Sequence, residues 1–214
     1  MTNYIVVASH VRYHEPRARL LASFSWPHII VTLNGSNRDE TRVEDGITYI
    51  NMLTNIYEYS AFYAPLHVGN PEDAYLLVHD TTIAGPNFAA KAAEAFAEFH
   101  RAGVDILWCS SSGQCNVAVF NRRAAVVARD MWGTRSRLDK GHAIVMEHCP
   151  ECGDSLKSRG DLRQQYVSQA TREVSRHPVY SEYVRVGMHY PYLDIVKYFL
   201  LVENLENVRH PDIP

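Results

Sequence analysis

Residues 74–85, AYLLVHDTTIAG, carry the pattern that decides the fold. The apolar run at 75–78 predicts a buried strand, and His79, Asp80, two threonines and a glycine follow closely after it. A continuous apolar run is typical of a strand that is covered on both faces, as in parallel sheets. An imidazole beside a carboxylate at the end of such a strand indicates one of two things. It is either a metal and phosphate site or a turn in which Asp80 bonds to a threonine.

Similar apolar runs recur along the chain, and segments with helical spacing separate many of them. Strands are predicted at 4–8, 29–33, 47–51, 75–78, 105–109, 117–120 and 143–147, and helices at 15–24, 55–64, 86–102, 161–176 and 191–208. The clearest helix begins at Pro86 and stops at Gly103, with Phe88, Phe96 and Phe99 on one face. This alternation predicts an α/β fold with a mostly parallel central sheet and helices on both faces.

The length and composition fit a single domain over residues 1–214. The chain has 46% hydrophobic and 21% charged residues, and its formal net charge of -3 gives no reason to expect nonspecific nucleic-acid binding. No apolar run reaches the roughly 18 residues of a membrane span, and the N-terminus shows no cleavable signal. Four cysteines do not indicate a secreted disulfide framework. We therefore expect a soluble, cytoplasmic protein.

Polar residues follow the first two predicted strands. Ligands of open α/β sheets bind outside the carboxyl ends of the strands, so these positions are the ones to search. The first strand leads into Ser9, His10 and Arg12, and the second leads into the loop LNGSN, which begins its polar part at Asn34. All four residues are candidates for substrate binding, although loops are polar in any protein.

Two further segments offer polar groups to a pocket. Asn55 and Tyr59 are four residues apart on a predicted helix and share a face, which is either a pocket wall or a solvated surface. In SSSGQCNVAVFN, residues 110–121, Gly113 allows a close backbone approach, while Gln114 and Asn116 offer amides to sugar hydroxyls. The alternative for this segment is a β-hairpin with a polar turn.

Cys149 and Cys152, in HCPECGD, have the spacing of half a zinc site. A structural zinc ion needs four ligands, and Cys109 and Cys115 are poorly spaced to supply a second pair. We interpret the segment as a loop with two free thiols and keep a zinc site as the alternative. The sequence contains no G-x-G-x-x-G, no G-x-x-x-x-G-K-[ST], no H-E-x-x-H and no G-x-S-x-G. Their absence weakens the usual dinucleotide, ATPase and esterase interpretations.

The order of these motifs resembles that of GT-A glycosyltransferases, which have a Rossmann-like α/β/α sandwich fold. The matching features are a nucleotide loop after the first strand, an acidic motif in LLVHDTT and a later glycine-amide loop that enters NVAVFN. They cover roughly residues 4–121, and the compact length is similar to that of small virus-encoded members of the chlorella-virus type. The resemblance implies transfer of a sugar from a nucleotide-sugar, with a UDP-sugar as the expected donor, to a glycan or other hydroxyl acceptor.

The resemblance also implies roles for individual residues. In that family a D-x-D motif holds Mn2+ or Mg2+ against the diphosphate, but here Val78 stands at the first position and only Asp80 matches. Asp80 is then the metal ligand and a catalytic residue, with His189 as a further ligand and His79 at the substrate. An inverting enzyme also needs a carboxylate base, for which Glu147 is the candidate.

Two other functional classes stay open on the sequence alone. One is another phosphate-handling enzyme, a nucleotidyltransferase or nucleotide hydrolase, that uses His79 and Asp80. The other is a non-catalytic α/β module in which Cys149 and Cys152 form part of a zinc site. Nucleotide binding is expected of a glycosyltransferase and of another phosphate-handling enzyme, but not of the non-catalytic module. Cleavage of the nucleotide without an acceptor would favour the phosphate-handling enzyme over the glycosyltransferase.

Overall fold

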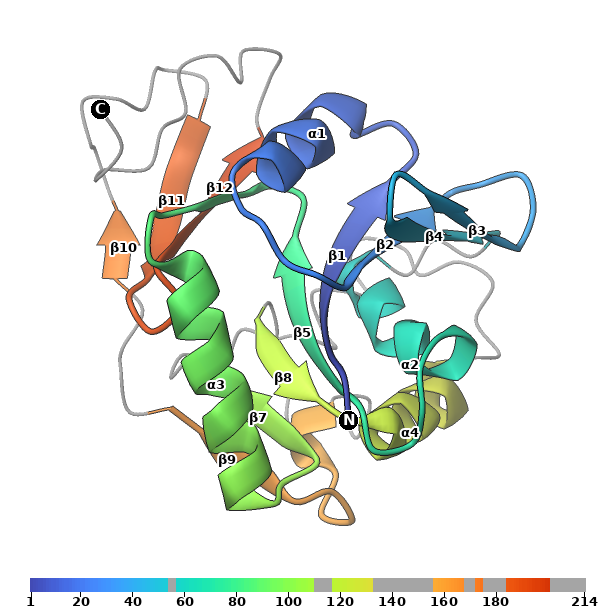
Figure 1. Cartoon of the computed structure of the whole chain (residues 1–214), viewed down its shortest axis with the longest axis vertical. Helices are drawn as coiled ribbons and strands as arrows, with labels where there is room; N and C mark the ends of the chain where they lie inside the picture. The colour runs from blue at the N-terminus through green and yellow to red at the C-terminus, as the bar shows by residue number, and fades with distance from the viewer. Residues whose placement is uncertain (54–56, 110–116, 133–155, 168–171, 175–183, 201–214) are drawn as a thin grey trace.

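A computed structural model describes residues 1–53, 57–109, 117–132, 156–167, 172–174 and 184–200 (Figure 1). Within these ranges the chain forms an eight-stranded sheet, a four-stranded sheet and helices on both faces of the larger sheet. No helix in these ranges is long and apolar enough to cross a membrane. The α/β class with a mostly parallel central sheet is the one that the sequence predicts.

The larger sheet has the strand order β3-β4-β2-β1-β5-β8-β7-β9 and the smaller one β10-β11-β12-β6. The strands of the larger sheet are β1 (Asn3–His10), β2 (Ile29–Asn34), β3 (Glu40–Glu44), β4 (Ile47–Met52), β5 (Ala74–His79), β7 (Ile106–Trp108), β8 (Ala118–Phe120) and β9 (Gln164–Tyr166). Those of the smaller sheet are β6 (Thr82–Ala84), β10 (Arg172–Val174), β11 (Val184–Tyr190) and β12 (Ile195–Leu200). The helical elements are α1 (His14–Ala22), η1 (Tyr57–Tyr63), α2 (Ala64–His67), α3 (Phe88–Ala102), α4 (Arg122–Trp132) and η3 (Leu156–Ser158).

The centre of the larger sheet is the parallel set β4-β2-β1-β5. All six residues of β5 are buried, as the continuous apolar run at 75–78 predicts, because helices cover both faces of the sheet. One face packs against η1, α2 and α4, and the other packs against α1 and α3. The predicted strands at 4–8, 29–33, 47–51 and 75–78 are confirmed, whereas the predicted strand at 143–147 lies outside the described ranges.

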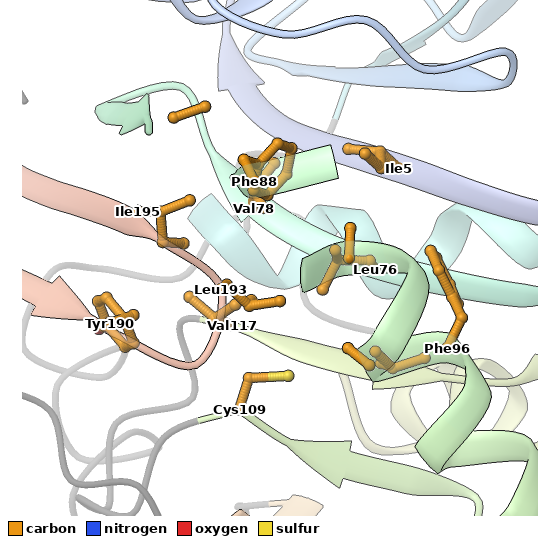
Figure 2. Packing of buried hydrophobic residues seen from close by; sticks show 14 of the residues in the cluster. Ile5, Leu76, Val78, Phe88, Phe96, Cys109, Val117, Tyr190, Leu193 and Ile195 are labelled. Atoms are coloured by element: carbon orange, nitrogen blue, oxygen red, sulfur yellow. The ribbon is translucent and has the colours of Figure 1, made fainter. Parts of the chain in front are cut away.

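Helix α3 follows the predicted amphipathic pattern. Phe88, Phe96 and Phe99 are buried on one face, and Gly103 ends the helix in a left-handed conformation with φ 61°. Figure 2 shows Phe88 near Val78 and Phe96 on the side of Leu76, within the same part of the core. The pattern therefore located both the helix and its buried face.

Two predicted helices are wrong over the residues that the structure describes. The segment 161–176 contains β9, which pairs in parallel with β7, and β10, which pairs with β11. The segment 191–208 contains β12, which lies between β11 and β6. The apolar residues of β12 fit the 3.6-residue period of a helix as well as the two-residue period of a strand. Pairing with strands on both sides favours the extended form. The predicted helix at 55–64 is a 3-10 helix, η1, followed by the short α2, and residues 54–56 are not described.

Asp194 links the smaller sheet to the start of α3. It lies just before β12 with φ 55°, and its Oδ2 accepts a hydrogen bond of 2.8 Å from the Asn87 N–H. The Gly85 N–H donates to the Asp194 carbonyl oxygen at 2.7 Å, and a Cβ atom on Gly85 would overlap the carboxylate. A carboxylate at a helix N-terminus pairs an otherwise unsatisfied N–H group and interacts well with the helix dipole.

We expect Asp194→Ala to destabilise the protein by about 1–2 kcal/mol, since it removes a cap of α3. The control is Asp45→Ala, because Asp45 also has a positive φ, 50°, but is exposed and caps no helix. Chemical denaturation of both variants measures the difference, which isolates the cap from the backbone conformation. Equal losses in the two variants would contradict the capping role.

Candidate nucleotide-binding site at the sheet edge

The carboxyl ends of β1, β2 and β5 lie side by side. The register places His10 opposite Asn34 and Ala8 opposite His79, so the residues that end these strands meet at one edge. The strand order reverses between β1 and β5, because the chain continues from β1 to β2 and β4 on one side and then returns to β5 on the other. Such a switch point is where open α/β sheets bind ligands.

Ser9 and Asp80 flank this switch point and are joined by a buried hydrogen-bond network. The Ser9 hydroxyl donates to Asp80 Oδ2 at 2.8 Å, and the Arg17 guanidinium of α1 donates to the Ser9 oxygen at 3.1 Å. Arg17 also donates to the carbonyl oxygen of His10 at 3.3 Å. All three side chains of the network are at most 9% exposed. The sequence did not single out Arg17, because nothing in its spacing separates it from the exposed Arg12 or the half-buried Arg19.

Burial raises the pKa of the Asp80 carboxyl to about 6. Four contacts oppose this effect: the Ser9 hydroxyl, the Arg17 charge and the main-chain N–H groups of Thr81 and His10. The carboxyl is therefore mostly ionised at neutral pH and titrates in mildly acidic solution. A buried carboxyl that titrates in this range is more common at functional sites than elsewhere.

His10 lies at the open side of this edge. Its Nδ1 accepts a hydrogen bond of 3.1 Å from the Arg12 N–H, and its ring centroid is 5.8 Å from that of Tyr13, which is 45% exposed. Gly35, with φ 71°, passes so close that a Cβ atom there would overlap the imidazole. Burial and then the Arg12 charge lower the pKa of His10. The result is a fixed, neutral aromatic surface, which is suited to stacking against a flat ligand.

Asn34 and Tyr59 are more buried than the sequence suggested. The Asn34 amide donates to the Ser9 carbonyl oxygen at 2.8 Å and to the Ser60 hydroxyl at 2.9 Å. These contacts tie β2 to β1 and η1. Tyr59, a residue of η1, is 2% exposed and packs in the core. Both residues support the edge of the sheet from inside.

His79 is also buried, and its Nε2 has no hydrogen-bond partner within the part of the chain that the structure describes. Burial lowers its pKa well below the usual value, and the nearby Lys197 charge lowers it further. The imidazole is therefore neutral in this structure. Lys197 was not singled out from the sequence, because the segment 191–208 was predicted as a helix. Thr82 was considered only as a turn partner of Asp80.

The described residues do not make up a Mn2+ or Mg2+ site. Among them, no group of three or more His, Cys, Asp or Glu side chains lies close enough together to hold a metal ion. Asp80 is the carboxylate that the sequence assigned to this role, but its Oδ2 is bound to Ser9 and the Arg17 cation lies beside it. His189, the other proposed ligand, lies on β11, where it pairs with Val196 of β12. A hard divalent ion usually has several oxygen ligands.

Several residues that the sequence singled out lie outside the described ranges. They are the substrate-binding candidates Asn55, Gly113, Gln114 and Asn116, the candidate base Glu147, and the cysteines Cys149 and Cys152. Cys109 is described; it is buried, and burial raises the pKa of its thiol. A buried thiol with a raised pKa is a poor nucleophile.

No protein-family model matches the sequence, and no curated protein matches it. Among solved structures, the chain is similar to the apo-form glycosyltransferase GlyE of Streptococcus pneumoniae TIGR4, with a TM-score of 0.44 and 11% sequence identity. The similarity covers 78% of this chain and 45% of the other, so this chain spans less than half the length of the structure that it matches. A similarity this distant assigns no residue and no activity.

Proposed function

We propose that this protein is a glycosyltransferase of the GT-A type, which binds a nucleotide-sugar across the carboxyl ends of β1, β2 and β5. The observation that carries the proposal is the buried network of Ser9, Asp80 and Arg17 at the switch point between β1 and β5. This is the edge at which an open α/β sheet binds nucleotides. A UDP-sugar is the expected donor, and a glycan or other hydroxyl compound is the expected acceptor.

The site offers a different surface to each part of such a donor. His10 and Tyr13 present partly exposed rings for a flat base, and Gly35 leaves the space that the His10 ring occupies. Ser9 and Asp80 lie further in, at the point where the diphosphate and ribose would follow. Because the Asp80 carboxylate repels a diphosphate, positive charge is needed nearby, and Arg17 is the first source of it.

In the transfer, the bond between the sugar C1 atom and the diphosphate oxygen breaks, and its electron pair leaves with the diphosphate. The acceptor oxygen bonds to C1 and loses its proton to a base. Positive groups fixed near the leaving oxygens stabilise the charge that develops there. Glu147 stays the predicted base of an inverting enzyme. A requirement for Mn2+ or Mg2+ stays a prediction from the sequence, and the roles of Ser9, Asp80 and Arg17 do not depend on the metal.

Calorimetric titration with UDP, UDP-glucose, GDP and GDP-mannose tests this proposal. We expect one nucleotide to bind, and Gly35→Ala to weaken its binding by at least about tenfold, because the added methyl group displaces the His10 ring. Gly46→Ala is a matched control. Gly46 has a similar φ of 78°, but a Cβ atom there would meet nothing within 4 Å.

Three outcomes would contradict the proposal. Absence of binding by every nucleotide, with and without Mn2+, would exclude a nucleotide-sugar site. Equal effects of Gly35→Ala and Gly46→Ala would show that backbone strain alone weakens binding. Rapid cleavage of the nucleotide without any acceptor would instead favour a nucleotide hydrolase.

A further inference from the structure

A second group of buried polar side chains lies at the end of β5, next to the network of Asp80. It consists of His79 at the end of β5, Thr82 at the start of β6 and Lys197 on β12. The register pairs Lys197 directly with Thr82, and the Lys197 charge acts on His79. Their exposed fractions are 8%, 1% and 6%, in that order. Three separate strands therefore bring an imidazole, a hydroxyl and an ammonium group together.

Two of these groups lack the partners that buried polar atoms normally have. Within the described ranges, neither His79 Nε2 nor Thr82 Oγ1 makes a hydrogen bond to the protein. More than nine in ten buried polar groups are paired in native structures, so each exception needs an explanation. One explanation is a ligand that is absent from the free chain.

The chemistry of the three groups points to an anion. Lys197 carries a positive charge, the Thr82 hydroxyl can donate, and the imidazole can donate from Nε2 in one of its neutral tautomers. Hydrogen bonds from such donors to phosphate oxygens are among the stronger ones in proteins. Among the described residues, Arg17 is a second buried cation at this edge, beside Asp80.

We propose that Lys197, with His79 and Thr82, binds the diphosphate of the donor and supplies positive charge that a divalent metal ion supplies in relatives with a complete D-x-D motif. This assignment explains why the described residues form no metal site although an anionic ligand is expected at the same edge. The identity of the ligand rests on the proposed glycosyltransferase function. The presence of an anion site rests on the three side chains alone.

The test measures binding of inorganic pyrophosphate and of UDP in the presence of EDTA. We expect both to bind to the wild-type protein, and Lys197→Met to weaken both by at least about tenfold, since it removes the charge and keeps a chain of similar volume. Lys91→Met is the matched control, because Lys91 is partly exposed on α3 and pairs with Glu94. It should change neither affinity.

The unfolding temperature separates a ligand-binding role from a structural one. If Lys197 binds an anion, UDP should raise the unfolding temperature of the wild-type protein by more than that of Lys197→Met. A lower unfolding temperature with unchanged affinity would overturn the inference. If the variant fails to fold, Thr82→Val decides, because it removes a hydroxyl group and keeps the shape. Unchanged affinity in that variant would likewise overturn the inference.

The two ligands also distinguish failure of this inference from failure of the proposed function. One result would be that UDP binds equally well to Lys197→Met, and another that UDP binds only with Mn2+. Either result would overturn the role of Lys197 without contradicting the proposed glycosyltransferase function. Pyrophosphate binding that needs Lys197, together with no nucleotide binding, would support the anion site and contradict the glycosyltransferase. Binding of neither ligand would overturn both.

Discussion

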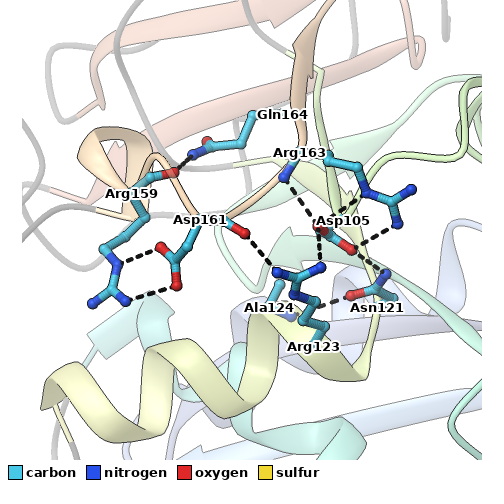
Figure 3. A network of polar contacts seen from close by, with 8 residues as sticks. All are labelled: Asp105, Asn121, Arg123, Ala124, Arg159, Asp161, Arg163 and Gln164. Atoms are coloured by element: carbon cyan, nitrogen blue, oxygen red, sulfur yellow. Dashed lines mark hydrogen bonds and ion pairs between the residues drawn. The ribbon is translucent and has the colours of Figure 1, made fainter.

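Replacing Asp105 by alanine is expected to destabilise the protein by about 2–4 kcal/mol, because it removes the buried acceptor of the Arg163 N–H and of the Asn121 amide, and the carboxylate that pairs with Arg163. Figure 3 shows the carboxylate at the centre of a polar network between β7, α4 and β9. Its oxygens accept from the Arg163 N–H at 2.9 Å and from the Asn121 amide at 3.1 Å, and the Arg163 guanidinium lies 3.3 Å away. The Asp105 side chain is 1% exposed.

Asp161→Ala is the matched control for this prediction. Asp161 binds both nitrogens of the Arg159 fork at 2.8 Å, yet it is 48% exposed. Surface ion pairs contribute little because water solvates both partners when the pair is broken. Urea denaturation should therefore show a large loss for Asp105→Ala and almost none for Asp161→Ala. Similar losses in the two variants would show that burial is not what makes Asp105 important.

The pH dependence of stability gives a second measurement of Asp105. Burial alone would raise its pKa, but the bonds from Arg163 and Asn121 hold the pKa below its usual value. For a carboxyl with a lowered pKa, the stabilisation is complete above the unfolded value of about 3.9 and is lost as the pH falls through the folded value. The difference between wild type and Asp105→Ala should therefore be constant near neutrality and shrink below about pH 4.

The sequence predicts the centre of the fold well because local pattern and tertiary environment agree there. The run at 75–78 is apolar without interruption, and β5 is buried on both faces between two helical layers. Phe88, Phe96 and Phe99 repeat at helical spacing, and α3 buries that face. In such segments the spacing of apolar residues alone identifies the element.

The smaller sheet is where local pattern and tertiary environment disagree. The β12 sequence, IVKYFL, also fits a helix, and its extended form depends on β11 and β6, which are distant in the sequence. Because of this error Lys197 was not considered as a site residue, since a lysine on a predicted helix is expected to be exposed to solvent. On β12 it is buried opposite Thr82. Arg17 was missed for a related reason, because its burial follows from how α1 packs on the strand ends.

Replacing Asp80 by asparagine is expected to lower sugar transfer by at least about 100-fold and to make the folded chain more stable at neutral pH. The substitution removes the negative charge beside Arg17, while the amide oxygen can still accept the hydrogen bond from the Ser9 hydroxyl. Release of nucleoside diphosphate from the donor that titration identifies measures the rate. Asp130→Asn is the control, because Asp130 is exposed and pairs with Arg129 on α4.

The stability of Asp80→Asn distinguishes a functional carboxylate from a structural one. The folded pKa of Asp80, about 6, exceeds the unfolded value of about 3.9, so the folded state holds the proton more tightly. Stability then falls as the pH rises from about 4 to about 6, and the ionised carboxylate destabilises the fold at neutral pH. Asparagine should recover roughly 1–3 kcal/mol at pH 7 and none at pH 4. A variant that is less stable at pH 7 would show that Asp80 has a structural role. A variant that is more stable but inactive is expected if the carboxylate serves the reaction and lowers the stability of the fold.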